Sequence, residues 1–451
     1  MLNGSALARL LARRQPENVE FGLERIRALL AGLERPELRF RAIHVAGTNG
    51  KGSVAATAEA ILRAAGRRTG LYTSPHLVEF AERIAIDGRP ADAALLEAVA
   101  ADVLPLADAV DATFFEATTA LAFAAFARSG VDSAVVEVGL GGRLDATNML
   151  GAEVAVVTSI ALDHADYLGS DLAGIAREKA GIISEGATVV LGELGGLARR
   201  ELLATAERVG AAVEEFGHAF GARDVREARD GVEFEFWSDR RSPRAPAGSR
   251  FALRSPLRGA HQAVNVAAAV AAVDAFTDRP PGPWMIEGEL VARAVAGVRW
   301  PGRFQVERAT GAAPAAAGGV QGPARVYDIA HNEAAARLLA EQVKRAAGRG
   351  DLPRPVVLVA AVLGDKDWRA VLGPLLAATD DAVLTDAPSA PPSRRWDLQA
   401  AAAELARFAS LTVEPDFERA LGRARELAGD GTVLITGSCH TVGDAMRIGG
   451  V

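Results

Sequence analysis

A ten-residue stretch from His44 to Ser53, HVAGTNGKGS, contains residue types that bind phosphate. It follows an apolar run and precedes a segment with helical character. A glycine-rich turn of this kind directs successive backbone N–H groups at phosphate oxygens, and the N-terminus of the following helix adds a positive dipole end. Lys51 can then reach the β- and γ-phosphates of a nucleotide. The predicted phosphate-binding residues are Gly47, Thr48, Asn49, Gly50, Lys51, Gly52 and Ser53.

Gly52 separates Lys51 from Ser53, whereas the usual loop places the hydroxyl directly after the lysine. A metal ion on the nucleotide therefore needs ligands from elsewhere. Ser74, Glu137 and His164 follow or end apolar runs with strand character. Parallel strands bring their carboxyl ends to one edge of a sheet, so we expect these side chains beside the loop. Together they suit Mg²⁺ or Mn²⁺, although each alone is also typical of a turn, a surface acid or a helix cap.

Lysine is rare in this sequence. Only four of the 50 basic residues are lysines, namely Lys51, Lys179, Lys344 and Lys366. Lysine is a compact point charge that can lose its proton, whereas arginine is planar and always charged. Chance placement explains some of the four, but a lysine kept in such an arginine-rich chain is a candidate for chemistry that a guanidinium cannot perform.

The surrounding elements alternate between short apolar runs rich in β-branched residues and longer helical segments, a rhythm typical of parallel strands joined by helices. This predicts an α/β fold with a mostly parallel sheet over residues 1–298. Pro301 and Gly302 mark a boundary, after which a smaller α/β domain is expected over 299–451. Residues 222–257 predict an antiparallel hairpin at the edge of the first domain, and residues 309–324 are of low complexity, which favours a flexible hairpin tip.

Length and composition exclude several classes of protein. The chain has 451 residues and a formal charge of −7, with a pI of about 5.7, so no basic surface is expected for nucleic acid. No run of 18 apolar residues could cross a membrane, and no signal sequence is recognisable, so a cytoplasmic protein is expected. Cys439 is the only cysteine, which rules out an internal disulfide.

Several further motifs carry a resemblance to one family. They are FGLERI, IHVAGTNGKGS, TSPHL, FFEATT, EVGLGGRLDATN, DHADYLG, REKAGI, GAHQAVNVAAA, PGRFQ, DIAHN and GDKD. These motifs extend from residue 21 to about residue 368. Together they resemble the bacterial folylpolyglutamate synthase/dihydrofolate synthase enzymes of the Mur ligase group. The resemblance implies a P-loop Mur-ligase-type domain followed by a Rossmann-like glutamate-ligase domain.

The same resemblance implies an ATP-dependent ligase that adds L-glutamate to dihydropteroate, reduced folates or both through an acyl phosphate. It implies two Mg²⁺ sites held by Ser74, Glu137, His164 and a carbamylated Lys179, and it gives catalytic roles to Lys51, His164 and Lys179. A carbamate requires a neutral amine, which arginine cannot supply. The additional nucleotide-binding residues that it implies are Asn265, Arg303 and Asp328. Glutamate would contact Arg83, His331 and Ser438, and the pterin-bearing substrate would lie beside Thr113, Phe114, Phe115, Glu116, Leu144, Asp145 and Ala146.

Three other functions remain open. A cell-wall Mur ligase needs an N-terminal uridine-nucleotide domain, and the sequence before Gly47 is too short for one. A small-molecule P-loop kinase would place Ser or Thr directly after Lys51 and would not need a second α/β domain. A switch or scaffold could bind ATP without ligation. The expected partners are small-molecule substrates only, with neither nucleic acid nor membrane, and the expected state is a monomer.

Overall fold

The computed structural model describes residues 5–13, 22–163, 167, 169, 171–240, 248–279, 287–308, 322–405 and 410–449. The chain forms two compact units that divide between Arg299 and Trp300. Two short segments of the first half, 76–79 and 162–164, group with the second unit, which the domain ranges expected from the sequence do not include. Among the described residues, no helix is both long and apolar enough to cross a membrane.

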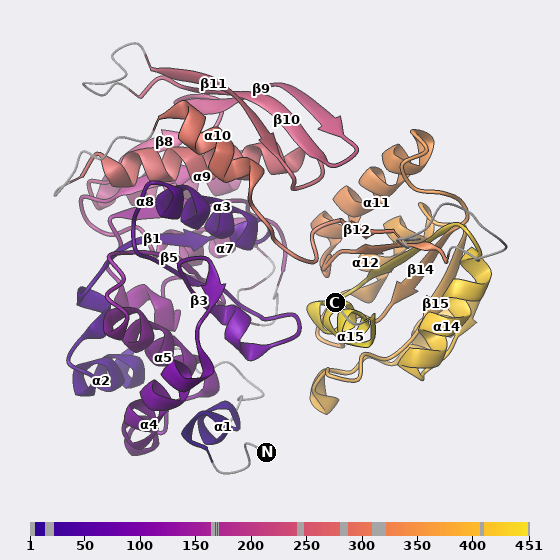
Figure 1. Cartoon of the computed structure of the whole chain (residues 1–451), viewed down its shortest axis with the longest axis horizontal. Coiled ribbons are helices and arrows are strands. Elements are labelled where there is room, and N and C mark those ends of the chain that lie inside the picture. Colours follow the sequence, from indigo (N-terminus) through magenta and orange to yellow (C-terminus); the bar gives the residue numbers. More distant parts are fainter. Residues whose placement is uncertain are drawn as a thin grey trace, which may run out of the picture. The chain divides into compact units, whose positions relative to one another are not determined.

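The first unit is built on an eight-stranded sheet (Figure 1). In sheet order the strands are β4 (Arg89–Pro90), β3 (Ile84–Ile86), β2 (Thr69–Tyr72), β5 (Ser133–Glu137), β1 (Arg41–Ala46), β6 (Val154–Val157), β7 (Thr188–Leu191) and β8 (Ala212–Glu215). The six strands from β2 to β8 are parallel, and β3 and β4 are antiparallel additions at one edge. The mostly parallel α/β fold expected from the sequence is therefore confirmed.

Helices cover both faces of this sheet because its central strands are apolar on both sides. The helices of the unit are α1 (Ala6–Leu11), α2 (Glu24–Gly32), α3 (Lys51–Ala64), α4 (Ala93–Ala109), α5 (Phe114–Arg128), α7 (Leu172–Ala180), α8 (Gly196–Arg208), α9 (His261–Thr277) and α10 (Gly288–Ala296), with 3₁₀ turns at η1 (Pro36–Leu38), η2 (Phe80–Arg83) and η3 (Ala146–Met149). Helices α1, α2, α4 and α5 share one apolar cluster with β1 and β5, and α7 and α8 share another with β6 and β7. Helices α3 and α9 pack together and against the same sheet.

The region expected to form a hairpin is a separate three-stranded antiparallel sheet. Its strands are β9 (Phe220–Ala228), β10 (Gly231–Ser238) and β11 (Ser249–Ser255), and β10 lies in the middle. The sheet packs on α9 and α10 rather than extending the main sheet. The sequence prediction missed β9 because residues 223–227 of this strand are all exposed or charged, so the sequence lacks the apolar–polar alternation of a half-buried strand.

The second unit has a six-stranded sheet in the order β12 (Gln305–Glu307), β13 (Ala324–Tyr327), β17 (Thr432–Thr436), β14 (Val356–Ala360), β15 (Asp381–Leu384) and β16 (Leu411–Val413). Only the β12–β13 pair is antiparallel. Its helices are α11 (Glu333–Gly348), α12 (Trp368–Leu376), α13 (Leu398–Leu405), α14 (Phe417–Ala428) and α15 (Cys439–Gly449), with a 3₁₀ turn at η4 (Pro392–Arg394). The low-complexity residues 309–321 lie outside the described residues.

Alternating strand residues of the second unit point to two apolar clusters, as a pleated sheet requires. Leu358 and Leu434 face α11, α12 and α13, whereas Val359 and Ile435 face α14 and α15. Leu77 and Val78 of the short segment 76–79 pack against the second of these clusters. The arrangement is a doubly wound α/β layer structure with a peptide from the first half of the chain added to it.

Candidate active site

The phosphate loop joins β1 to α3 in a conformation that requires glycine at two positions. Gly47 has φ +145° and Gly50 has φ +88°. A Cβ on Gly47 would lie 1.9 Å from Thr158 Oγ1, and one on Gly50 would lie 2.5 Å from Asn265 Oδ1. Larger residues would therefore collide with β6's extension or with α9, and the backbone angle alone disfavours them.

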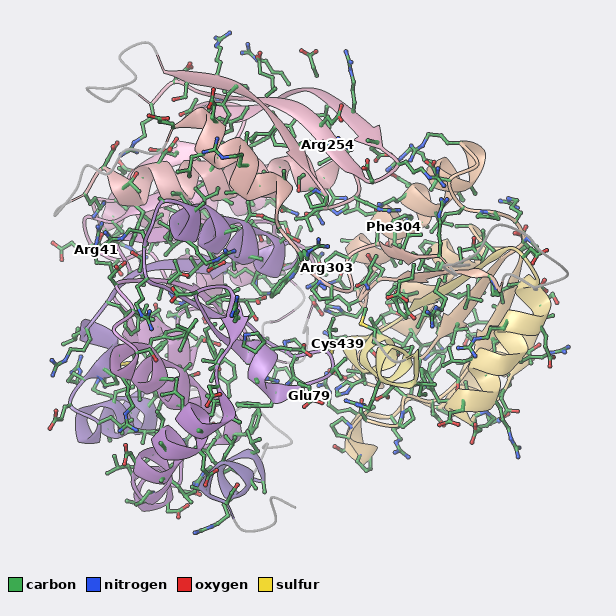
Figure 2. The ribbon with its side chains drawn as sticks, viewed as in Figure 1. Arg41, Glu79, Arg254, Arg303, Phe304 and Cys439 are labelled. Atoms are coloured by element: carbon green, nitrogen blue, oxygen red, sulfur yellow. The ribbon has the colours of Figure 1, made fainter. Side chains whose placement is uncertain are left out.

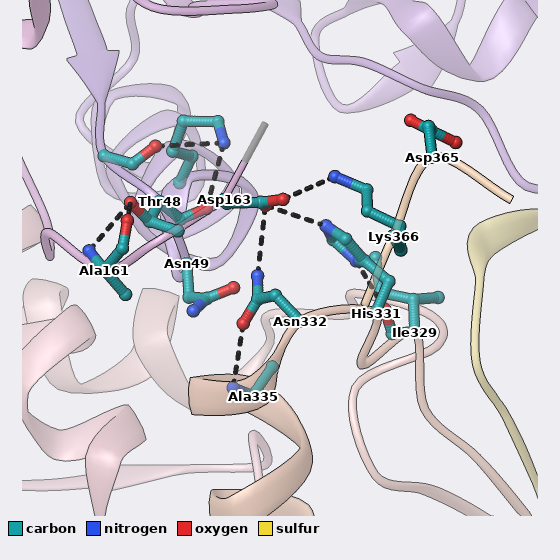
Figure 3. Close-up of polar contacts among 12 residues, drawn as sticks. Thr48, Asn49, Ala161, Asp163, Ile329, His331, Asn332, Ala335, Asp365 and Lys366 are labelled. Atoms are coloured by element: carbon teal, nitrogen blue, oxygen red, sulfur yellow. Dashed lines mark hydrogen bonds and ion pairs between the residues drawn. The ribbon is translucent and has the colours of Figure 1, made fainter. Parts of the chain in front are cut away.

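The residues that follow β6 hold the loop in place. The Thr48 N–H donates to Ser159 O over 2.7 Å, and Thr158 Oγ1 donates to Asn49 O over 2.6 Å. Thr48 Oγ1 donates to Ala161 O and accepts from Ala161 N, at 3.1 and 3.0 Å (Figure 3). Because all of these bonds are made within the protein, they hold the loop in its folded shape, which lowers the ordering cost of association.

Two lysines converge on one backbone carbonyl. Lys51 Nζ lies 3.2 Å from Gly47 O and 3.3 Å from Thr48 O, and Lys179 Nζ donates to the same Gly47 O over 2.9 Å. Glu137 Oε1 lies 3.9 Å from Lys51 Nζ. Lys179 is 5% exposed, so its amine is held in a poorly solvated place. Two amines beside one carboxylate form a region suited to a polyanion.

Ser53 supplies a buried hydroxyl in the first turn after the loop. Its side chain is 1% exposed, and among the described residues its Oγ makes no hydrogen bond. A buried hydroxyl without a partner costs free energy, so native proteins rarely keep one unless a ligand or ion uses it. Ser53 is in the first turn of α3, where free backbone N–H groups and the helix dipole also favour an anion.

The structure brings two of the four predicted metal ligands together. The backbone N–H of Ser74 donates to Glu137 Oε2 over 3.3 Å. Lys179 meets the same region through Gly47 O, and His164 lies outside the described residues. Within the described ranges no cluster of three His, Cys, Asp or Glu side chains could hold a metal ion. A carboxylate and a buried hydroxyl are nevertheless the oxygen donors that Mg²⁺ prefers.

Asn265 reaches the phosphate loop from α9. Its Nδ2 donates to Gln262 Oε1 over 2.9 Å, which orients the amide oxygen toward Gly50, as the close approach at that glycine shows. The predicted nucleotide residue therefore lies beside the loop, although 214 positions separate it from Lys51 and 218 from Gly47 in the sequence.

Residues predicted to contact the pterin substrate surround the start of α5. Thr113 and Glu116 form a capping box, in which Thr113 N and Oγ1 each lie 2.8 Å from Glu116 Oε2. Arg25 Nε donates to the same carboxylate. The guanidinium of Arg83 lies 5.4 Å from the ring centre of Phe114, a cation–π contact. The T-x-x-E signature of this capping box was present in the sequence and went unrecognised.

The turn after β5 carries the second group of predicted pterin contacts, Leu144, Asp145 and Ala146. Asp145 Oδ2 accepts from Leu140 N over 2.8 Å, and Oδ1 accepts from Thr147 N over 3.0 Å and from Thr147 Oγ1 over 2.5 Å. Burial raises the pKa of Asp145, while these hydrogen bonds oppose the change. The Asp145 side chain is therefore committed to holding its own turn.

In the second unit, Asp328 organises the residues around Arg303. Asp328 Oδ2 accepts from Phe304 N over 2.8 Å, and Oδ1 accepts from Ala330 N over 2.9 Å. Burial raises the pKa of Asp328, and the charge of Arg303 opposes that rise. Arg303 and Phe304 lie just before β12 (Figure 2). The two predicted nucleotide residues of this unit are thus neighbours in space.

A second cluster in this unit forms around Asp163. Its carboxylate pairs with Lys366 Nζ, accepts from Asn332 Nδ2 over 3.1 Å, and lies 3.4 Å from His331 Nε2 (Figure 3). His331 Nδ1 is 2.8 Å from Ile329 O. Lys366 and Asp163 are 6% and 8% exposed. Sequence reasoning gave neither residue a role because 203 positions separate them.

Ser438 lies at the start of α15 and is 1% exposed. Its Oγ accepts from Thr441 N over 3.1 Å and lies 2.7 Å from Thr441 Oγ1. Among the predicted glutamate residues, His331 and Ser438 thus belong to the second unit and Arg83 to the first.

Family models match both units of the chain. The Mur ligase middle domain matches residues 45–273, and the Mur ligase glutamate ligase domain matches residues 302–439. The chain is 36% identical to the dihydrofolate synthase/folylpolyglutamate synthase of Mycobacterium tuberculosis, over 98% of this chain and 89% of that protein. It is 32% identical to the enzyme of the same name from Escherichia coli, over 96% and 92%.

Solved structures agree. Mycobacterium tuberculosis folylpolyglutamate synthase complexed with ADP matches with a TM-score of 0.84 and 35% identity, over 99% of this chain and 98% of that one. Escherichia coli FolC in complex with DHPP and ADP matches with a TM-score of 0.80 and 30% identity, over 99% and 97%. These matches extend over both compact units rather than one.

Proposed function

The chain belongs to the dihydrofolate synthase/folylpolyglutamate synthase family of Mur ligases, and we infer from this that it joins L-glutamate to dihydropteroate, to reduced folates, or to both, with ATP as the energy source. The observation that carries the inference is the preformed loop of Gly47 to Ser53. There the Ser53 hydroxyl has no partner among the described residues, and Lys51 and Lys179 meet at Gly47 O. We assign ATP binding to residues 1–298 and glutamate ligation to residues 299–451.

The reaction has two steps. A carboxylate oxygen of the pterin substrate attacks the γ-phosphorus of ATP, which gives an acyl phosphate and ADP. The deprotonated amine of glutamate then attacks the acyl carbon, and the tetrahedral intermediate expels inorganic phosphate and leaves the amide. Neither step needs a covalent nucleophile from the protein, so catalysis depends on positioning and charge stabilisation.

The residues of the loop bind and neutralise the transferring phosphoryl group. The backbone N–H groups at the start of α3 and the Lys51 ammonium face the phosphates, and the Ser53 hydroxyl, which has no partner among the described residues, adds a polar contact. Asn265 orients the nucleotide from α9. We propose that Arg303 and Asp328 of the second unit also bind the nucleotide, with Arg303 as the cation for the γ-phosphate.

We propose that Ser74, Glu137 and His164 hold Mg²⁺ and that a second Mg²⁺ uses a carbamate on Lys179. When bound, the ions neutralise charge on the nucleotide and the acceptor carboxylate. Ser74 and Glu137 already meet through a hydrogen bond. The buried amine of Lys179 lies beside the loop, where carbamylation would exchange a positive group for a carboxylate that can bind a metal.

For the remaining substrates, we propose that Arg83, His331 and Ser438 bind glutamate. The pterin-bearing substrate lies against Phe114, Phe115 and the turn of Leu144 to Ala146, and Thr113 and Glu116 hold the start of α5 beside it. Phe115 packs closely on Gly139, where a Cβ would be 2.3 Å from its ring. The expectation of a monomer stays a prediction.

ADP formation in two parallel assays tests this function. One contains ATP, glutamate and dihydropteroate, and the other contains tetrahydrofolate in place of dihydropteroate. We expect ADP formation that requires glutamate in at least one assay, together with a product heavier by one glutamate residue. ADP formation that ignores glutamate, or nucleotide binding without turnover in both assays, would instead favour a kinase or a nucleotide-dependent switch.

A further inference from the structure

His44 is a buried histidine that has no part in the function described above. It lies in β1, three residues before Gly47, and is 1% exposed. Its Nε2 lies 2.8 Å from Thr147 Oγ1, in the turn that follows β5. Burial lowers the pKa of His44 to about 3, so the imidazole is neutral in the folded protein at neutral pH and carries one N–H.

The hydrogen bonds around Thr147 fix where that proton lies. Thr147 Oγ1 is 2.5 Å from Asp145 Oδ1, and a carboxylate can only accept. A hydroxyl has a single proton, so Thr147 donates it to Asp145 and must accept from His44. The neutral histidine therefore has its proton on Nε2, and the three side chains form one directed chain from His44 through Thr147 to Asp145.

This chain of hydrogen bonds ends in the turn that borders the pterin substrate. Asp145 Oδ2 accepts from Leu140 N over 2.8 Å, which closes the turn. One side of the turn touches Phe115, because a Cβ on Gly139 would lie 2.3 Å from that ring. The other side touches α7, since a Cβ on Gly142 would lie 3.1 Å from the Lys179 Cα. A shift of the turn would therefore change the packing of the Phe115 ring on Gly139 and the packing of the Lys179 backbone on Gly142 at the same time.

We propose that His44 is a positioning residue for the pterin substrate: through Thr147 and Asp145 it sets the place of the turn 139–147 relative to the strand that begins the phosphate loop. This inference rests on the proposed function. In this proposal β1 serves both substrates: it leads through Gly47 into the nucleotide loop, and its His44 side chain positions the turn that borders the pterin substrate. His44 itself touches neither substrate.

The test compares the affinity of full-length variants for the two kinds of substrate. Calorimetric titration with dihydropteroate and with tetrahydrofolate, each in the presence of AMPPCP and Mg²⁺, gives dissociation constants without turnover. We expect His44→Leu to raise the dissociation constant of the bound pterin compound about tenfold, and to change that of AMPPCP less than about twofold. His44→Gln keeps an N–H donor, so its pterin affinity should return to within about threefold of the wild type.

Thr147→Val removes the same link with little change of shape, and it serves where the His44→Leu protein does not fold. Thr188→Val is the matched control, because Thr188 is a buried strand threonine whose Oγ1 accepts from Arg279, away from the turn. Equal pterin affinity in wild type, His44→Leu and Thr147→Val would overturn the inference and leave the proposed function intact. A wild-type protein that binds neither pterin compound would contradict the proposed function itself.

Discussion

The phosphate loop follows β1 and the turn 139–147 follows β5, and these two strands are neighbours in the sheet of the first unit. The loop and the turn use their polar side chains in opposite ways. In the turn, Asp145 and Thr147 have hydrogen-bond partners within the protein. In the loop region, the Ser53 hydroxyl is buried without one among the described residues. Polar groups that satisfy one another hold a shape, whereas a preformed but unsatisfied group marks the place of a ligand.

The largest expected effect on activity comes from a substitution in the phosphate loop region. Lys51→Ala removes the ammonium group beside Gly47 O and Glu137, and we expect kcat to fall by about 10³-fold or more with either pterin substrate. The folded state should be preserved, because the side chain is in a binding region. Steady-state ADP formation and thermal unfolding check both points. An active Lys51→Ala enzyme would remove the basis for a ligand-binding role of the loop.

Lys179 contacts both the phosphate loop, at Gly47 O, and the turn 139–147, at Gly142. Its substitution therefore tests the proposed carbamate between them. Lys179→Ala should lower kcat by about 10²-fold, and short carboxylic acids such as acetate should restore part of it by replacing the carbamate. Lys344, an exposed residue of α11, provides the control. Lys344→Ala should keep the kcat of the wild type, and acetate should not change it. No rescue at any acetate concentration would count against the carbamate while leaving ATP binding untouched.

His44, which is hydrogen-bonded to the turn 139–147, makes the unfolding free energy depend on pH. Burial lowers the pKa of His44 from 6.5 to about 3 in the folded protein. Between pH 3 and pH 6.5, His44 is therefore protonated in the unfolded chain and neutral in the folded protein. The stability from neutral His44 is complete above pH 6.5 and is lost progressively as pH falls toward 3. Between pH 7 and pH 5 the wild type should lose about 2 kcal/mol more unfolding free energy than His44→Gln.

Denaturant unfolding of both proteins at the two pH values measures that difference. Asp274 changes the stability in the opposite direction, since burial and the charge of Asp278 raise its pKa to about 7, and its contribution to stability therefore grows as pH falls. It is present in both proteins, however, so its contribution cancels when the two are subtracted. Parallel losses in wild type and His44→Gln would show that His44 is not held neutral by its surroundings.

The smallest change in stability is expected at Ser53, and it gives the sharpest contrast. Ser53→Ala removes a hydroxyl that has no described partner, so the unfolding free energy should change by less than about 0.5 kcal/mol, while the AMPPCP dissociation constant rises about fivefold. Thr147→Val removes a hydroxyl that makes two hydrogen bonds, and should cost about 2 kcal/mol. Equal destabilisation by both substitutions would erase the distinction between the two regions.

Local features explain what the sequence could predict. The glycine-rich loop and the alternation of apolar runs with helices are encoded within a few residues, so the α/β fold, the loop and its place after β1 were accessible. The rule that parallel strands end at one edge predicted that Ser74 and Glu137 lie near one another, and the structure joins them by a hydrogen bond. Asn265 was placed by resemblance, since nothing local links α9 to Gly50.

Long-range pairings were beyond the sequence. The ion pair of Asp163 with Lys366 joins residues 203 positions apart, and no local pattern brings them together. The same holds for His44, because its burial and its bond to Thr147 depend on how β1 and the turn after β5 pack. The assignment of residues 76–79 and 162–164 to the second unit likewise follows from tertiary packing alone.

The central claim is that the loop of Gly47 to Ser53 presents ATP so that a carboxylate of the pterin substrate takes the γ-phosphoryl group. The most direct measurement labels that carboxylate with ¹⁸O and analyses the released phosphate by mass spectrometry after a glutamate-dependent turnover. The account predicts that one ¹⁸O atom appears in inorganic phosphate for each amide formed. Unlabelled phosphate, with amide still formed, would contradict it.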